Sequence, residues 1–219
     1  MTTLLRTEQL LVSRQDPRTR AFTRVGTLTF DGARYTFHYD AEATRPLPGL
    51  PLGGHHQSET LFPIFAERVM DPRRPERPTT LERLGLPPDA GPFEVLAVTG
   101  GGRTGDTYEL TPLPQEGPIN LPFLVHGVRH LNTREQAAVA SLRPGDQLSL
   151  VHESDNAING RALLVTQDRV RLGYVPDPLL DYVHAIVRSA HTLRVERLNS
   201  VECGLHMRLL VRLSGRYER

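Results

Sequence analysis

Runs of alternating apolar and polar residues, separated by Gly, Pro, Asn and Asp, occur along most of this chain. The clearest pair, VGTLTF and RYTFHY, flanks Asp31-Gly32. An Asp-Gly step between two alternating runs is a strong indication of a β-hairpin. The preceding run LLVSRQ predicts a further strand, turned into the hairpin at Asp16-Pro17. The start of the chain therefore predicts a small antiparallel meander.

Three helices are predicted after a loop rich in Pro and Gly, ATRPLPGLPLGGHHQ. The first covers SETLFPIFAERVM, with Ser58 as its N-cap and Pro63 in its early turns, where proline is tolerated. Its apolar face would consist of Leu61, Phe62, Phe65 and Met70. Two shorter helices, TTLERLGL and PFEVLAVTG, lead to a strand at TYELTPLP. The segment QEGPIN is predicted to be a linker that ends a first domain near residue 118.

The remainder, residues 119–219, predicts a second domain of short strands and two helices. Strands are expected at FLVHGVRH, QLSLVHE, RALLVTQ and VRLGYVPD, and a helix at TREQAAVASL is capped by Asn132 or Thr133. A closing helix, PLLDYVHAIVRS, precedes a final hairpin formed by HTLRVERLN and LHMRLLVRL. The predicted fold class is therefore α+β: a β-meander with helices, followed by a small antiparallel barrel with two helices.

Composition narrows the functional classes. The net charge of +1 does not indicate nucleic acid by itself, although all 26 basic residues are Arg, which favours bidentate phosphate contacts. One cysteine, Cys203, excludes an internal disulfide framework and a Cys-based zinc site. No apolar run approaches the ~18–20 residues that cross a bilayer, and the charged N-terminus does not match a secretory signal. We therefore expect a cytoplasmic protein without a membrane partner.

The first half resembles the N-terminal subdomain of HipA-like kinases over roughly residues 20–114. The resemblance is carried by the order of the hairpin at Asp31-Gly32, the helix LFPIFAERVM followed by Arg73-Arg74, the segment LGL, and GGGRTGD before a strand. No room remains for the kinase portion, and GGGRTGD lacks the Lys-Ser/Thr of a P-loop. The resemblance therefore implies an accessory module without phosphoryl-transfer activity.

The second half resembles the HIRAN domain, a compact OB-like module associated with holding single-stranded DNA ends. The motifs that carry the resemblance are GVRH at 127–130, PGD at 144–146, ESDN at 153–156 and LGYVP at 172–176. The resemblance implies a pocket for a DNA end, formed by the arginine of the first strand and its neighbour, the Asn-rich turn and the residues after the glycine of the fourth strand. An arginine can contact a phosphate there, and a flat side chain beside it can stack on a base. Carried over by position, the residues of this pocket are Arg129, His130, Asn156, Ile158, Asn159 and Tyr174. The predicted nucleic-acid-binding residues are Arg129, His130, Asp155, Asn156, Asn159, Arg161 and Tyr174.

This chain departs from the family pattern at three places. Ile158 and Asn159 stand where helicase-linked members have an aromatic residue and an acid, and Asp177 stands close to where they have a basic residue. Losing a stacking platform removes about 1–3 kcal/mol per base, and an acid repels phosphate. We therefore expect weaker end binding than in the repair helicases, or a different ligand.

Three alternatives stay open. The Asp and Asn residues of the turn can simply bond the turn's own backbone. The chain can be a regulatory module that docks on a HipA-like kinase or a repair enzyme through the apolar face of the first helix. A hydrolase or nuclease would need paired carboxylates, for which Glu153 and Asp155 are the nearest. The leading expectation is a non-enzymatic protein without cofactor or metal that binds single-stranded DNA or DNA ends.

Overall fold

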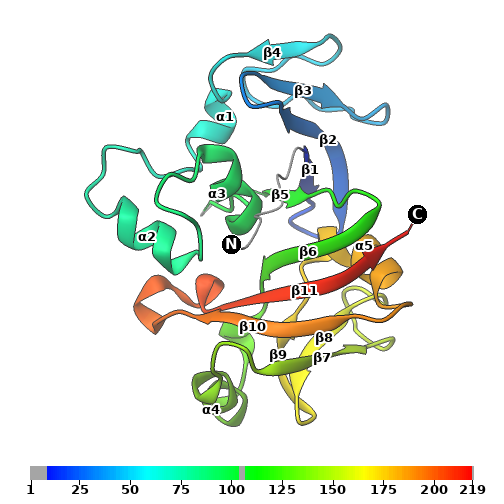
Figure 1. Ribbon diagram of the computed structural model, residues 1–219. Helices are drawn as coiled ribbons and strands as arrows, with labels where there is room; N and C mark the ends of the chain where they lie inside the picture. Colours follow the sequence, from blue (N-terminus) through cyan, green and yellow to red (C-terminus); the bar gives the residue numbers. More distant parts are fainter. Residues whose placement is uncertain (1–8, 104–106, 219) are drawn as a thin grey trace. The chain divides into compact units, whose positions relative to one another are not determined.

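The computed structural model describes residues 9–103 and 107–218. The chain divides into two compact units, one formed by the chain up to Leu113 without Arg83–Gly85, the other by Arg83–Gly85 and the chain from Pro114 onward. Both units combine helices with antiparallel sheets, which confirms the α+β class (Figure 1). Two stretches used in the sequence analysis, the N-terminal segment and GGGRTGD, lie partly outside the described residues.

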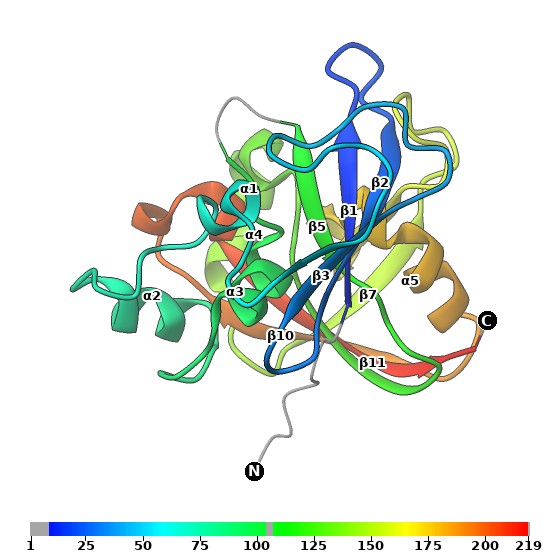
Figure 2. The same ribbon diagram turned by 90° about the horizontal axis from the view of Figure 1, so that it is seen from above.

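The first unit contains a five-stranded antiparallel sheet in the order β4-β3-β2-β1-β5, of which Figure 2 shows β5, β1 and β2 side by side. The predicted hairpin and the strand before it are confirmed. Asp31 closes the hairpin turn because its Oδ1 accepts the backbone N–H groups of Ala33 at 2.9 Å and Arg34 at 2.8 Å. The strands are β1 (Gln9–Gln15), β2 (Phe22–Phe30), β3 (Tyr35–Tyr39), β4 (His56–Ser58) and β5 (Tyr108–Pro112).

The helices of this unit are α1 (Pro63–Ala66), α2 (Arg77–Arg83) and α3 (Pro92–Thr99). The prediction of one long helix from Ser58 was wrong, since Ser58 ends the strand β4 and only Pro63–Ala66 is α-helical. Proline lacks an N–H group and is favoured at the start of a helix, so Pro63 begins α1 rather than lying inside a longer helix. The core combines α1 and α3 with the sheet and is rich in rings, with Phe37, Phe65 and Phe93 almost fully buried.

The second unit contains a six-stranded antiparallel sheet in the order β6-β11-β10-β7-β8-β9. Its ladder does not close into a barrel, which corrects the predicted topology. The chain after β6 and the end of β9 meet at one isolated bridge, between His126 and Tyr174. The strands are β6 (Gly117–Leu124), β7 (Gln147–His152), β8 (Leu163–Gln167), β9 (Val170–Tyr174), β10 (Thr192–Leu198) and β11 (Leu209–Tyr217).

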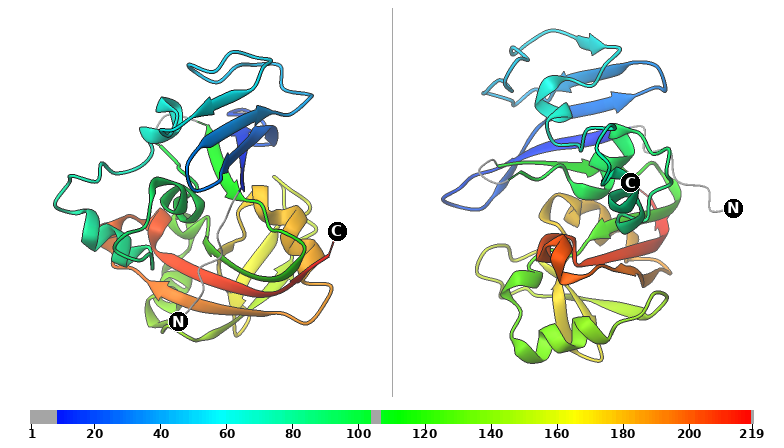
Figure 3. Two further views of the ribbon diagram at one scale, coloured as in Figure 1. Left: turned by 45° about the horizontal axis from the view of Figure 1, so that its top comes forward. Right: turned by 90° about the vertical axis from the view of Figure 1, so that its left-hand side faces the viewer.

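Helices α4 (Thr133–Ser141) and α5 (Leu180–Ile186) pack on β9 and β11, respectively (Figure 3). Four 3₁₀ turns complete the described part of the unit: η1 (Val128–His130), η2 (Asp177–Leu179), η3 (Val201–Cys203) and η4 (Leu205–Met207). The core beneath them is mainly aliphatic, and Val165, Leu172 and Val211 are fully buried in it.

The segment predicted as a linker before residue 119 is instead the beginning of β6. Gly117 pairs with Tyr217 and Ile119 with Gly215, so this edge strand is held by the last strand of the chain. Pro118 and Pro122 both occur in β6. Val125, just after β6, donates its backbone N–H to the carbonyl of Leu209 at 2.9 Å. Because the N–H groups of successive residues point to opposite sides of a strand, the backbone nitrogens of the even-numbered residues of β6 point away from β11.

Candidate functional site

Tyr174 connects the end of β9 to the turn that carries two of the predicted site residues. Its backbone exchanges hydrogen bonds with His126, each at 2.9 Å. Its ring lies against Gly127, where an added β-carbon would stand 3.1 Å from Cδ2. Gly127 has a φ of 77°, a conformation that favours glycine, and ends the extended segment there. The turn bearing Arg129 and His130 therefore begins beside the Tyr174 ring.

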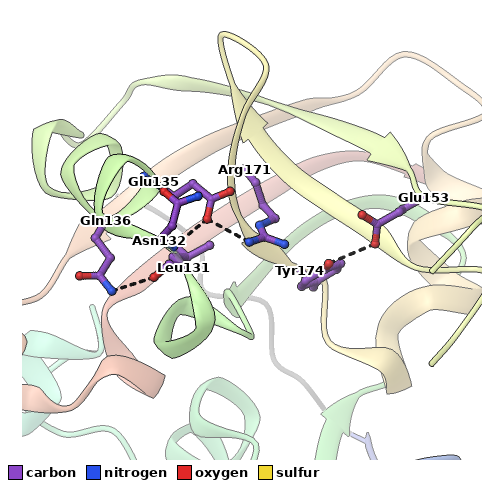
Figure 4. A network of polar contacts seen from close by, with 7 residues as sticks. All are labelled: Leu131, Asn132, Glu135, Gln136, Glu153, Arg171 and Tyr174. Carbon is purple, nitrogen blue, oxygen red and sulfur yellow. Dashed lines mark hydrogen bonds and ion pairs between the residues drawn. The ribbon is translucent and has the colours of Figure 1, made fainter. Parts of the chain in front are cut away.

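Glu153 joins the Tyr174 ring to the Asn-rich turn, and Figure 4 shows its bond to Tyr174. The Tyr174 hydroxyl donates to Glu153 Oε2 at 3.1 Å, and Asn156 Nδ2 donates to the same oxygen at 2.5 Å. Burial raises the pKa of Tyr174, and the bond to the Glu153 carboxylate raises it further. The hydroxyl therefore stays protonated at neutral pH and acts as a donor.

Asn156 and Asn159 shape the turn between β7 and β8. Asn156 Oδ1 accepts the backbone N–H groups of Ile158 and Asn159, both at 3.0 Å. Asn159 Oδ1 accepts the N–H of Arg161 at 2.9 Å, and its Nδ2 donates to Asp177 Oδ2 at 3.3 Å. The two amides thus hold the turn in shape, as short polar side chains commonly do. Contact of either amide with a ligand would require these bonds to be exchanged.

Arg171 on β9 lies between Glu135 and Tyr174 in Figure 4. Arg171 Nη2 donates to Glu135 Oε2 at 2.9 Å, and this bond is the main reason that the pKa of Glu135 is lowered. Glu135 also belongs to a capping box with Asn132 at the start of α4, which confirms Asn132 as the cap. One carboxylate thereby fixes the start of α4 to β9 near the Tyr174 ring.

Arg129 and His130 lie in η1 and not on a strand, which corrects the predicted placement. Both are exposed, and Arg129 Nε donates to His130 Nε2 at 2.9 Å. Arg161 is exposed as well, but its Nη1 pairs with the Asp181 carboxylate at 2.5 Å. Asp155 is exposed and has no hydrogen-bond partner in the part of the chain that the structure describes.

The predicted residues therefore separate into two groups. Asn156, Asn159 and Tyr174 belong to one hydrogen-bonded network that centres on Glu153. Arg129 and His130 adjoin this network through Gly127 and remain accessible to a ligand.

The structure also describes the features behind the alternative hypotheses. Glu153 accepts bonds from an amide and a phenol rather than pairing with Asp155. Among residues 9–103 and 107–218, no group of three or more His, Cys, Asp or Glu side chains is arranged to hold a metal ion. Within the same ranges, no helix is both long enough and apolar enough to cross a bilayer.

The segment expected to dock on a kinase contributes to the core of its own unit. Phe62 and Phe65 are 7% and 1% exposed, and Leu61, Ile64 and Val69 pack against the same core. Most of the apolar face of this segment is therefore covered.

Comparison with known proteins adds little to this description. No protein-family model and no curated protein matches the chain. A solved structure that is similar to part of it is the crystal structure of a protein from Lactobacillus plantarum, determined by a structural genomics consortium. That chain is 22% identical, and the match covers 48% of this chain and 100% of the other at a TM-score of 0.36.

Two residues central to the network, Glu153 and Arg171, were not among the predicted site residues. Asn132 and Glu135 have the spacing of a capping box, which points to the position of Glu135 in the sequence. No local pattern identifies Arg171 as its partner, because the two residues belong to a helix and a strand 36 positions apart.

Proposed function

We propose that the second unit is a nucleic-acid-binding module that holds single-stranded DNA, with a preference for a free 3′ end. The observation that carries the proposal is the position of two exposed side chains, Arg129 and His130, which follow the glycine beside the Tyr174 ring by two and three residues. Arg129 is cationic, and His130 is flat. A guanidinium beside flat side chains is the combination that single-strand-binding surfaces use for phosphates and bases. The order of the HIRAN-like motifs agrees with this assignment.

The network supports a division of roles within the proposed interface. Arg129 would contact a phosphate, and His130 and Tyr174 would contact bases. Asn156 and Asn159 would position the turn rather than read the base directly, because their amides already bond within it. Ile158, with 69% of its surface exposed, stands at this turn and offers an apolar contact in place of the aromatic residue of the helicase-linked proteins.

Fluorescence anisotropy with a labelled single-stranded oligonucleotide tests the proposal. We expect binding at low ionic strength that weakens with added salt, because phosphate contacts release counterions. Arg129→Ala should weaken binding and reduce the slope of log K against log salt by about 0.7, the value for one lost phosphate contact on a single strand. Arg188→Ala is the matched control, since Arg188 is an exposed arginine of the same unit outside the network.

The outcomes separate the proposal from general charge attraction. A 3′-phosphorylated oligonucleotide should bind more weakly than one with a free 3′ hydroxyl. Absence of binding at low salt, or equal losses in the Arg129 and Arg188 variants, would refute the proposed interface.

A further inference from the structure

A pocket of about 410 Å³ opens in the first unit, far along the chain from the network around Tyr174. It is lined by the end of β1, the turn into β2, the first half of β2, the loop at residues 42–45 and the start of β5. Its volume falls within the range of small-molecule sites, about 300–1,000 Å³. We call it the Arg14 pocket, because Arg14 pairs with Thr23 on one side and with Tyr108 on the other, and all three residues line it.

A β-bulge shapes this pocket. The pairing of β1 with β2 shifts between Val12 and Ser13, so that Val25 is the extra residue of β2. Consecutive residues of a regular strand face opposite sides, yet Thr23, Arg24 and Val25 all line the pocket. Bulges re-aim side chains in this way and occur often next to binding sites.

Positive charge predominates at the pocket and its rim. Three arginines and two carboxylates line it: Arg14, Arg24, Arg45, Asp16 and Glu42. The turn between β1 and β2 adds two further arginines, at positions 18 and 20. The Asp16 carboxylate is held by its own turn, where Oδ1 accepts the N–H groups of residues 18 and 19 at 2.8 Å each. An anion that enters the pocket therefore meets three arginines, while Oδ1 of the Asp16 carboxylate already accepts two hydrogen bonds within its own turn.

Two of the lining arginines, Arg14 and Arg45, form no ion pair with a carboxylate of the described residues, although the backbone N–H groups of its own turn and, to a lesser extent, the charge of Arg14 lower the pKa of Asp16. Arg24 Nε donates to Asp40 at 2.9 Å. The Arg14 guanidinium carbon lies 6.0 Å from the centre of the Tyr108 ring, within reach of a cation–π contact. Arginine groups of this kind suit a phosphate, because their planar donors match its oxygens.

We propose that the Arg14 pocket binds a small organic phosphate, with the phosphate held by Arg14 and Arg45 and the organic part against Val25 and the Tyr108 ring. Glu42 is the lining carboxylate that such a ligand must tolerate. Neutralising Glu42 is therefore expected to strengthen binding, whereas removing either arginine weakens it. The proposal for this pocket does not rest on the proposed nucleic-acid interface.

The test is a calorimetric titration of the full chain with phenyl phosphate, which combines a phosphate and a flat ring. We expect saturable, salt-sensitive binding that weakens roughly tenfold in Arg14→Ala and in Arg45→Ala, as for the loss of a charge-assisted hydrogen bond in an open site. Glu42→Gln should tighten binding. Arg34→Ala, an arginine of the same unit outside the pocket, is the matched control and should bind as the unaltered protein does.

Further ligands identify what the site recognises. Inorganic phosphate should bind more weakly than phenyl phosphate, and benzoate and phenol should bind weakly or not at all. Equal binding of benzoate would overturn the assignment to phosphate, and equal affinity in Arg45→Ala and Arg34→Ala would overturn the site itself. Arg129→Ala should leave phenyl phosphate binding unchanged, so failure here and failure of the DNA-binding proposal are separate results.

Discussion

The two units are built on different kinds of core. In the first, Phe37 contacts Phe65 at 5.8 Å and Tyr39 at 4.9 Å between ring centres, so a few large rings hold the sheet and the short helix α1 together. In the second, Phe123 is the single aromatic residue among the buried members of the described core, and branched aliphatic side chains supply the rest. In the first unit, a few large side chains therefore contribute much of the stability of the core. In the second, many smaller aliphatic side chains each contribute a part.

The two units also differ in how their arginines are paired with carboxylates. In the second unit, arginines are matched with carboxylates: Arg171 with Glu135, and Arg212 with Glu196. In the pocket of the first unit, Arg14 and Arg45 have no such partner among the described residues. Matched charges stabilise a fold, while unmatched charges in a concave site are available to a ligand. Arg171 and Arg212 therefore have a structural role in the second unit, whereas Arg14 and Arg45 are the arginines of the first unit that we propose as ligand-binding residues.

Replacing a central ring should give the largest effect. Phe37 is fully buried, and Phe37→Ala should destabilise the first unit by about 3–5 kcal/mol, since both transfer energy and a cavity contribute. Hydrogen exchange resolves the units: the amides of β1–β3 should lose protection while those of β10 and β11 keep theirs. Leu193→Ala, in the aliphatic core, is the matched variant and should show the reverse pattern. Equal loss in both sheets after either substitution would contradict the view that each unit has its own core.

The charge pair of the final hairpin should give an intermediate effect. Arg212 donates to both oxygens of Glu196, at 2.6 and 2.7 Å, and this bond is the main reason that the pKa of Glu196 is lowered. A carboxyl with a lowered pKa in the folded state stabilises the fold above its unfolded pKa, near 4.5, and loses that contribution as pH falls through the folded pKa. Glu196→Gln should therefore cost about 1.5–3 kcal/mol at pH 7, the range for hydrogen bonds to charged groups.

Urea denaturation over a pH series measures this difference. The difference in unfolding free energy between Glu196→Gln and the unaltered protein should be full at pH 6–7. It should begin to shrink near pH 4.5, where Glu196 is protonated in the unfolded chain, and disappear as pH falls through the lowered pKa of the folded state. A gap that stays constant down to pH 3 would show that the charge of Glu196 is not responsible. The pKa of Glu135 is lowered as well, so the unfolding free energy of Glu196→Gln should still depend on pH to some extent.

The cap of α4 should give the smallest effect. Asn132 Oδ1 accepts the N–H of Glu135 at 3.0 Å, and Asn132→Ala should cost about 1 kcal/mol in the second unit. Asn132→Asp keeps an acceptor and is expected to retain most of the stability. Thermal unfolding of the three proteins tests the ranking, and equal losses in the two variants would argue against capping as the cause.

Local patterns predicted the elements whose partners are close in sequence. The Asp31-Gly32 hairpin, the Asn132 cap and the final hairpin were all identified from the chain itself. The predicted helix from Ser58 was wrong because its apolar spacing also suits a loop that feeds two phenylalanines into a core. The prediction of a linker was wrong because β6 pairs with β11, almost a hundred residues later in the chain. Short-range sequence patterns do not indicate so distant a partner.

The candidate site shows the same division. The residue types of the Asn-rich turn were visible in the sequence, and so was their proximity to one another. Their connection through Glu153 to Tyr174 depends on a side-chain contact across 21 positions, which the sequence does not reveal. The bulge that gathers Thr23, Arg24 and Val25 around one pocket is likewise a property of strand pairing rather than of local composition.

The two prolines of β6 affect whether another strand can add to this edge of the second sheet. Pro118 and Pro122 occupy the positions whose nitrogens face away from β11, and a proline nitrogen carries no hydrogen to donate. A foreign strand that paired with this edge would lack an N–H donor at positions 118 and 122, on either side of Asn120. The two prolines therefore hinder the addition of a further strand to this edge, as in fibril formation, and they remove no hydrogen bond between β6 and β11.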